Sequence, residues 1–125
     1  MEVGEAGEIL GRGDYINVNL GTIHGNVDIT ADYGKIHIDK MAADGGNVSI
    51  RTDYTGIKFG YDSGYHFDFE ISAEYASVKG KEDLEINVSR EKSSERYYSG
   101  YHGSPDSGKE VRINSEYGNI TLNRY

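Results

Sequence analysis

Apolar and polar residues alternate over short stretches along most of this chain. In the stretch 27–31, Val27, Ile29 and Ala31 fall on one side of an extended chain, and the polar residues between them fall on the other. This period of two is the pattern of a β-strand with one buried face. The stretch ends at an acidic residue followed by tyrosine and two turn-like residues, after which a second apolar-x-apolar stretch begins. The pattern predicts a strand–turn–strand unit and no helix.

This unit recurs along the chain. Three close copies span 27–38, 48–59 and 69–78, a further copy spans 111–122, and a half-copy covers 14–20. The tyrosines of five acidic-Tyr pairs follow one another at intervals of 18, 21, 21 and 42 residues, the last being twice the period. A constant period is the signature of stacked units. We therefore assign a structural role in the repeat to both members of each pair: Asp14 and Tyr15, Asp32 and Tyr33, Asp53 and Tyr54, Glu74 and Tyr75, Glu116 and Tyr117.

Stacking the units would place equivalent side chains in columns. The clearest apolar column contains Ile29, Ile50, Ile71 and Ile113. We therefore predict an all-β fold, and within that class a short single-stranded β-solenoid, similar to a β-helix, with rungs of about 21 residues.

The alternative is a β-sandwich or meander built from hairpins. Gly34-Lys35 and Gly118-Asn119 suit a two-residue hairpin turn, which requires positive φ angles. Ala76-Ser77 does not suit such a turn and Thr55-Gly56 does so only in part, whereas a solenoid corner needs no primed turn. The turn residues therefore favour the solenoid.

The chain length of 125 residues predicts one domain, 1–125, with an interruption at about 81–109. The interruption holds one degenerate rung, a polar stretch at 89–96 and a stretch of loop composition at 97–108. Aromatic side chains on loops commonly form binding surfaces. The candidate ligand-binding residues are therefore those of this excursion and of a second break near 61–66: Tyr97, Tyr98, Tyr101, His102, Tyr61 and Tyr65. The alternative is that these tyrosines fold back over a thin core.

Composition and motifs argue against several classes of partner and of catalytic activity. A formal net charge of −8 argues against nucleic acid and anionic membranes as partners. The chain has no cysteine, no stretch of apolar residues long enough to span a bilayer, and none of the short catalytic motifs of hydrolases, metalloproteases or nucleotide-binding proteins. The acidic residues recur beside every tyrosine of the repeat, as a turn element does and a unique active site does not. We expect no metal, no cofactor and no catalysis.

Four segments carry a family resemblance. They read Asp-Tyr-Gly-Lys-Ile-His-Ile at 32–38, Thr-Asp-Tyr-Thr-Gly-Ile-Lys-Phe at 52–59, Glu-Tyr-Ala-Ser-Val-Lys-Gly at 74–80 and Ser-Glu-Tyr-Gly-Asn-Ile-Thr-Leu at 115–122. Over about 14–125 the chain resembles a family of envelope proteins of Bacteroidetes-like bacteria that is named for a proposed adhesin role. The resemblance implies an exported β-solenoid-like domain of the cell envelope or cell surface and supplies no catalytic residues. The N-terminus lacks a signal segment, so we expect the chain to be the C-terminal part of a longer exported protein.

These observations give three hypotheses. The first is a noncatalytic, adhesin-like surface interaction domain that binds a glycan or a protein. The second is a purely structural or self-assembling module, in which open solenoid ends pair to form homo-oligomers. The third, and least favoured, is a glycan-active β-helix enzyme, for which the sequence shows no localised set of catalytic residues.

Overall fold

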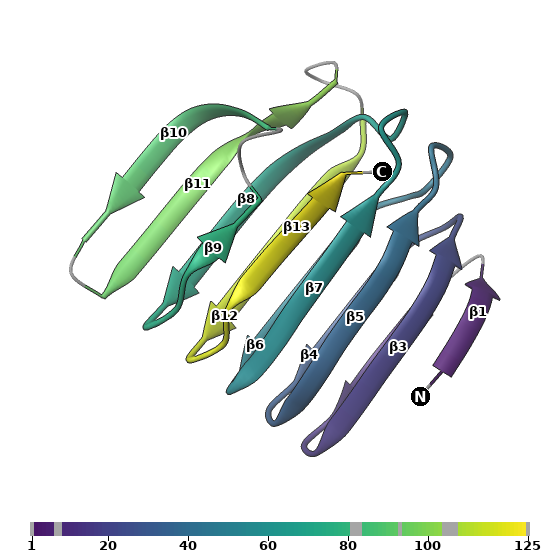
Figure 1. Cartoon of the computed structure of the whole chain (residues 1–125), viewed down its shortest axis with the longest axis horizontal. Coiled ribbons are helices and arrows are strands. Elements are labelled where there is room, and N and C mark those ends of the chain that lie inside the picture. The colour runs from purple at the N-terminus through teal and green to yellow at the C-terminus, as the bar shows by residue number, and fades with distance from the viewer. Residues whose placement is uncertain (1, 7–8, 81–83, 93, 104–107, 125) are drawn as a thin grey trace.

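The computed structural model describes residues 2–6, 9–80, 84–92, 94–103 and 108–124, and these residues form two β-sheets with no helix among them (Figure 1). The all-β prediction is confirmed. In spatial order, the first sheet contains β1 (Glu2–Ala6), β3 (Ile16–Ile23), β5 (Gly34–Met41), β7 (Thr55–Tyr61), β13 (Ile120–Arg124) and β9 (Val78–Lys79). The second sheet contains β10 (Glu85–Glu91), β11 (Glu95–His102), β8 (Phe67–Glu74), β12 (Glu110–Glu116), β6 (Val48–Asp53), β4 (Val27–Ala31) and β2 (Ile9–Gly13).

From β2 to β9, successive strands alternate between the two sheets, and β12 and β13 do the same. Each strand in these parts of the chain pairs in parallel with strands of other units, as β4 does with β2 and β6. The short connection that carries the chain from the second sheet to the first contains one of the repeat tyrosines in each unit: Tyr15, Tyr33, Tyr54, Tyr75 or Tyr117. Within the described ranges, the only strands consecutive in sequence that pair antiparallel are β10 and β11.

The C-terminal segment, residues 110–124, lies inside both sheets and not at their end. Its strand β12 pairs in parallel with β6 on one side and β8 on the other, and β13 lies between β7 and β9 (Figure 1). Ile113 is consequently the register partner of both Ile50 and Ile71. The order of strands in space therefore differs from their order in the chain.

The core lies between the two sheets and follows the period-two pattern. Val27, Ile29 and Ala31 of β4 are buried, whereas Asp28 is exposed. Each fully buried aliphatic or aromatic side chain contributes roughly 1.5–3 kcal/mol relative to remaining in water. At one end of this core, aromatic rings from β7, β8, β11 and the β7–β8 connection pack together, with Phe67 in ring contact with Tyr61, Tyr65 and His102.

The predicted loop excursion is wrong over most of its length. Residues 85–91 and 95–102 form the antiparallel strands β10 and β11, while 81–83, 93 and 104–107 lie outside the described residues. Among the described strands, β10 pairs with β11 alone at the edge of the second sheet, and it is exposed along nearly its whole length. Such a strand needs no apolar face, and its polar sequence therefore does not indicate a loop.

None of the described residues belongs to a helix long and apolar enough to cross a membrane.

Candidate binding groove and tyrosine column

A groove of about 620 Å³ runs across the outer face of the second sheet. One row of its lining consists of residues that are partners in the strand register: Arg51 of β6 pairs with Asn114 of β12, Asn114 with Ser72 of β8, and Ser72 with Tyr97 of β11. Arg90 of β10 continues this row as the partner of Tyr97. Five neighbouring strands thus each contribute one outward side chain to one line across the sheet.

The groove has a polar floor and an aromatic wall. Asn114 is exposed and Ser72 is half-buried, and both are short, so they leave the middle of the row low. Tyr97 lines one side, with the guanidinium carbon of Arg90 5.8 Å from its ring centroid. Beneath this surface Thr52, Ala73 and Ser115 are buried, as alternation along the strands requires.

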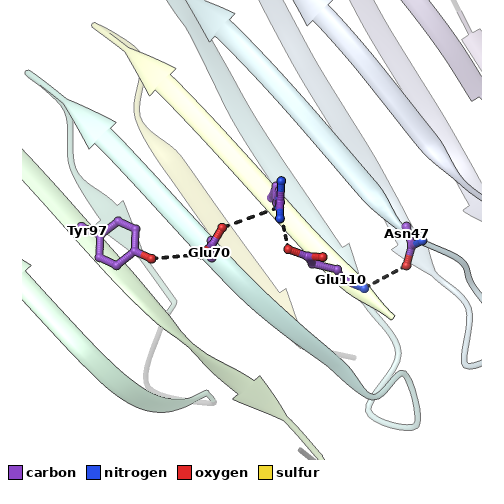
Figure 2. Close-up of polar contacts among 5 residues, drawn as sticks. Asn47, Glu70, Tyr97 and Glu110 are labelled. Atoms are coloured by element: carbon purple, nitrogen blue, oxygen red, sulfur yellow. Dashed lines mark hydrogen bonds and ion pairs between the residues drawn. The ribbon is translucent and has the colours of Figure 1, made fainter. Parts of the chain in front are cut away.

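A chain of polar contacts fixes the tyrosine wall (Figure 2). The Tyr97 hydroxyl donates to Glu70 Oε1 at 3.1 Å, and Arg112 Nε lies 3.6 Å from Glu70 Oε2 and 2.5 Å from Glu110 Oε1. The hydrogen bond from Arg112 to Glu110 raises the pKa of this guanidinium, with smaller contributions from the charges of both glutamates. The backbone N–H of Glu110 in turn donates to Asn47 Oδ1 at 2.9 Å. These contacts connect β11, β8, β12 and the turn before β6.

A second row consists of the acidic residues that precede the repeat tyrosines, and only part of it lines the groove. We call it the carboxylate row: Asp14, Asp32, Asp53, Glu116 and Glu74. Glu116 is the register partner of both Asp53 and Glu74, and all three line the groove. The charge of Asp53 is the main reason that the pKa of Glu116 is raised. A side-chain hydrogen bond with Asp14 is the main reason that the pKa of Asp32 is raised. The neighbouring carboxylates of this row therefore disfavour each other's ionised form.

Five tyrosines follow the carboxylate row and stack on one another; we call them the tyrosine column. Their order in space is Tyr15, Tyr33, Tyr54, Tyr117 and Tyr75, with neighbouring ring centroids 4.8–5.2 Å apart and ring planes within 6–12° of parallel. Tyr15, at one end, is 82% exposed, and the other four are 43–58% exposed. The column is thus a surface feature outside the hydrophobic core.

Three neighbouring members of this column have left-handed backbone conformations, with φ angles of 50° at Tyr54, 58° at Tyr117 and 53° at Tyr75. Such a conformation costs a residue with a side chain about 1–2 kcal/mol, and glycine or asparagine adopts it more readily. A stacked aromatic pair returns about 0.5–1.5 kcal/mol. Ring stacking therefore offsets part of the backbone strain at these turns.

The structure places the six predicted ligand-binding residues in two groups. Tyr61, Tyr65, Tyr98 and His102 are buried in the core, so their predicted display on loops is wrong. Tyr65 donates its hydroxyl to the Gly46 carbonyl, and His102 Nδ1 lies 2.6 Å from the Tyr65 carbonyl. Burial raises the pKa of Tyr98 to about 12, with a contribution from its hydrogen bond to Glu91.

Tyr97 and Tyr101 keep partly exposed side chains, but both lie on strand β11 and not on a loop. Tyr97 forms the wall of the groove, whereas Tyr101 lies further along β11, opposite Asp68 and Glu85. Sequence reasoning missed Arg51, Ser72 and Asn114. The 21-residue spacing between Arg51 and Ser72 was a signal that both occupy equivalent outward positions.

Among the residues that the structure describes, no group of three or more histidines and carboxylates is arranged to hold a metal ion. Comparison of the chain with protein-family models, with curated proteins and with solved structures finds no match.

Proposed function

We propose that this chain is a noncatalytic recognition domain that binds an oligosaccharide in the groove of the second sheet. The observation that carries the proposal is the row from Arg51 through Asn114 and Ser72 to Tyr97, which forms an open groove with a polar floor and one aromatic wall. Small-molecule sites typically combine an apolar contact with a few placed polar groups.

The chemistry of the groove suits a ligand rich in hydroxyl groups. A hydroxyl both donates and accepts hydrogen bonds, and the groove offers donors on Arg51 and Arg90, acceptors on Glu74 and Glu116, and both kinds on Asn114. The Tyr97 ring supplies the apolar contact for the C–H face of a sugar. Because Tyr97 is held by its hydrogen bond to Glu70, little side-chain entropy is lost when a ligand packs against it.

The arrangement of carboxylates supports binding and not hydrolysis. Glycoside hydrolysis uses two carboxyl groups that flank the scissile bond, one as acid and one as base or nucleophile. Asp53, Glu116 and Glu74 stand instead in one line on one side of the groove, on adjacent strands. We therefore place this domain among binding proteins.

Two further statements belong to the same proposal. We infer that the stacked parallel strands form a short β-solenoid, with residues 110–124 as a rung inserted out of chain order. We also infer, from the family resemblance of the sequence, that the domain works at a bacterial cell envelope or surface after export.

Self-assembly is the second candidate function. At the N-terminal end, β1 pairs only with β3, and β2 only with β4, so each presents a backbone edge without a strand partner among the described residues. Such edges can pair with the edge of another copy. Sedimentation over a wide range of protein concentrations tests this candidate: growing oligomers support it, and a constant monomer mass contradicts it.

The test of groove binding is an oligosaccharide array on the purified domain, followed by calorimetric titration of each hit. Tyr97→Ala and Asn114→Ala should each weaken binding by about tenfold or more, equivalent to about 1.4 kcal/mol. Tyr101→Ala is the matched control, because it removes a partly exposed tyrosine of the same strand outside the Arg51–Tyr97 row. A blank array, or hits that Tyr97→Ala and Asn114→Ala leave unchanged, would contradict the proposal.

A further inference from the structure

We propose that the tyrosine column is a second binding site, beside the groove, which takes elongated, planar, cationic aromatic molecules along its outer edge. The column is roughly 20 Å long, given four ring-to-ring distances of 4.8–5.2 Å. An elongated ligand could therefore contact several rings at once.

The stacking decides which part of each ring is available. Because neighbouring rings lie nearly parallel, the faces of Tyr33, Tyr54 and Tyr117 are covered on both sides by other tyrosines. These three residues are 43–52% exposed, and the exposed parts of their side chains are therefore mainly ring edges and hydroxyl groups. Sugar rings and single cations, which prefer aromatic faces, find few faces here.

A flat aromatic ligand is complementary to a row of ring edges. The exposed edges and hydroxyl groups of the stacked rings form a regular line, along which the face of a planar molecule gains dispersion contacts. A planar conjugated molecule lying along the column would place its face on several tyrosine edges together. The regular spacing repeats this contact at each ring.

The carboxylate row sets the preferred charge of the ligand. Each column tyrosine directly follows one of the five acidic residues in the sequence. Glu116 is the register partner of both Asp53 and Glu74. These three carboxylates precede three consecutive rings of the column, Tyr54, Tyr117 and Tyr75. A cationic ligand would reduce the repulsion within this row, whereas an anionic ligand would increase it.

The backbone supplies an independent argument. The left-handed residues Tyr54, Tyr117 and Tyr75 are consecutive in the stack. A turn with no other role would be less strained with asparagine or glycine at these positions. Strain that is retained together with an exposed aromatic side chain is typical of functional positions.

Thioflavin T, a planar cationic dye, is the probe. A fluorescence titration and equilibrium dialysis are performed on the fraction that sediments as monomer, and saturable binding at a fixed ratio of dye to protein is the expected result. The double variant Tyr54→Asn/Tyr117→Asn should weaken binding at least tenfold, because it removes two central rings while keeping residues that accept the left-handed backbone. Tyr97→Ala should leave dye binding unchanged, since Tyr97 belongs to the groove.

Charge variants and a direct readout complete the test. Asp53→Asn/Glu116→Gln should weaken dye binding several-fold, and the anionic planar dye Congo red should bind the unmodified domain more weakly than thioflavin T. In the unmodified protein, NMR ring signals of Tyr33, Tyr54 and Tyr117 should shift on titration with thioflavin T. This measurement does not depend on the folding of any variant. The proposal is overturned by absence of binding to monomer, by binding that the double asparagine variant retains in full, or by ring shifts confined to other tyrosines.

Discussion

The ring of Tyr117 stacks on the ring of Tyr54 with centroids 4.8 Å apart, although 63 residues of chain separate the two. This contact exists because the C-terminal segment, residues 110–124, lies between β6–β7 and β8–β9. The same insertion brings Asn114 between Arg51 and Ser72. The C-terminal segment therefore contributes a ring to the tyrosine column and part of the lining of the groove.

The central position of the C-terminal segment predicts that its core residue is important for stability. Ile113 is 1% exposed and pairs with Ile50 and Ile71. Ile113→Ala should lower the free energy of unfolding by about 2–5 kcal/mol, measured by chemical denaturation. Ile86→Ala is the control, because Ile86 is only half-buried on edge strand β10. This substitution should lower the free energy of unfolding clearly less. Equal costs would argue that the C-terminal segment is peripheral.

The turn after Tyr117 predicts a strict requirement for glycine. A Cβ atom at Gly118 would lie 2.0 Å from the backbone carbonyl oxygen of Thr55, the first residue of β7. Gly118→Ala should therefore destabilise the fold by about 1–3 kcal/mol. A Cβ at Gly56, on strand β7, would meet nothing within 4 Å, so Gly56→Ala should change stability by less than about 0.5 kcal/mol. Thermal unfolding of both variants checks this difference, and tolerance of alanine at 118 would contradict the close approach of Gly118 to Thr55.

The carboxylate row predicts that removing one of its charges stabilises the fold, by an amount that depends on pH. The pKa of Glu116 is raised above its ordinary value of 4.5, chiefly by the charge of Asp53, so the fold favours the neutral carboxyl group. The stability that the fold gains from the neutral Glu116 carboxyl group is fully present below pH 4.5. It is lost as the pH rises through the higher pKa that Glu116 has in the folded protein. Glu116→Gln, which is neutral at every pH, should therefore raise the denaturant midpoint at pH 7, with the difference from the unmodified protein vanishing in acid.

Asp44 is the matched control, because its pKa is shifted in the opposite direction to that of Glu116. Its pKa is lowered from 3.8, chiefly by a hydrogen bond from His24, so the stabilising contribution is present above pH 3.8 and is lost as the pH falls through the lower folded value. Asp44→Asn should thus lower the denaturant midpoint at pH 7. If Glu116→Gln also lowers it at pH 7, the carboxylate row is not a source of repulsion.

The period-two alternation was sufficient to predict most strands, because burial on one face imposes it directly. Val27, Ile29 and Ala31 are buried as that pattern requires. The order of the strands could not be predicted in the same way. β8 and β12 share the same alternation of buried and outward positions, with Ile71 matching Ile113, so this pattern does not decide which of them lies beside β6.

The candidate site was predicted only in part, for a related reason. Tyr97 was recognised as a binding candidate, but the stretch 97–108 was read as a loop from its content of glycine, serine and proline. A period of two is present there as well, since Tyr98 and His102 are buried while Tyr97 and Tyr101 are partly exposed. The partners of Tyr97 in the groove depend on strand order, which the residue pattern does not encode.

The measurement that tests the central claim most directly is disulfide formation between engineered cysteines in a chain that has none of its own. The claim is that the C-terminal segment separates β6 from β8 and so builds both the groove and the tyrosine column. Arg51 and Asn114 are register partners on adjacent strands, whereas Arg51 and Ser72 are two strands apart. Adjacent strands are about 4.8 Å apart and alternate strands about 10 Å, and a disulfide cannot form when the Cα atoms are more than about 7 Å apart.

Under mild oxidation at low protein concentration, Arg51→Cys/Asn114→Cys should close an intramolecular disulfide and Arg51→Cys/Ser72→Cys should remain reduced, as measured by mass spectrometry. The reverse result, with 51 joined to 72 and not to 114, would show that the units stack in chain order and would contradict the account.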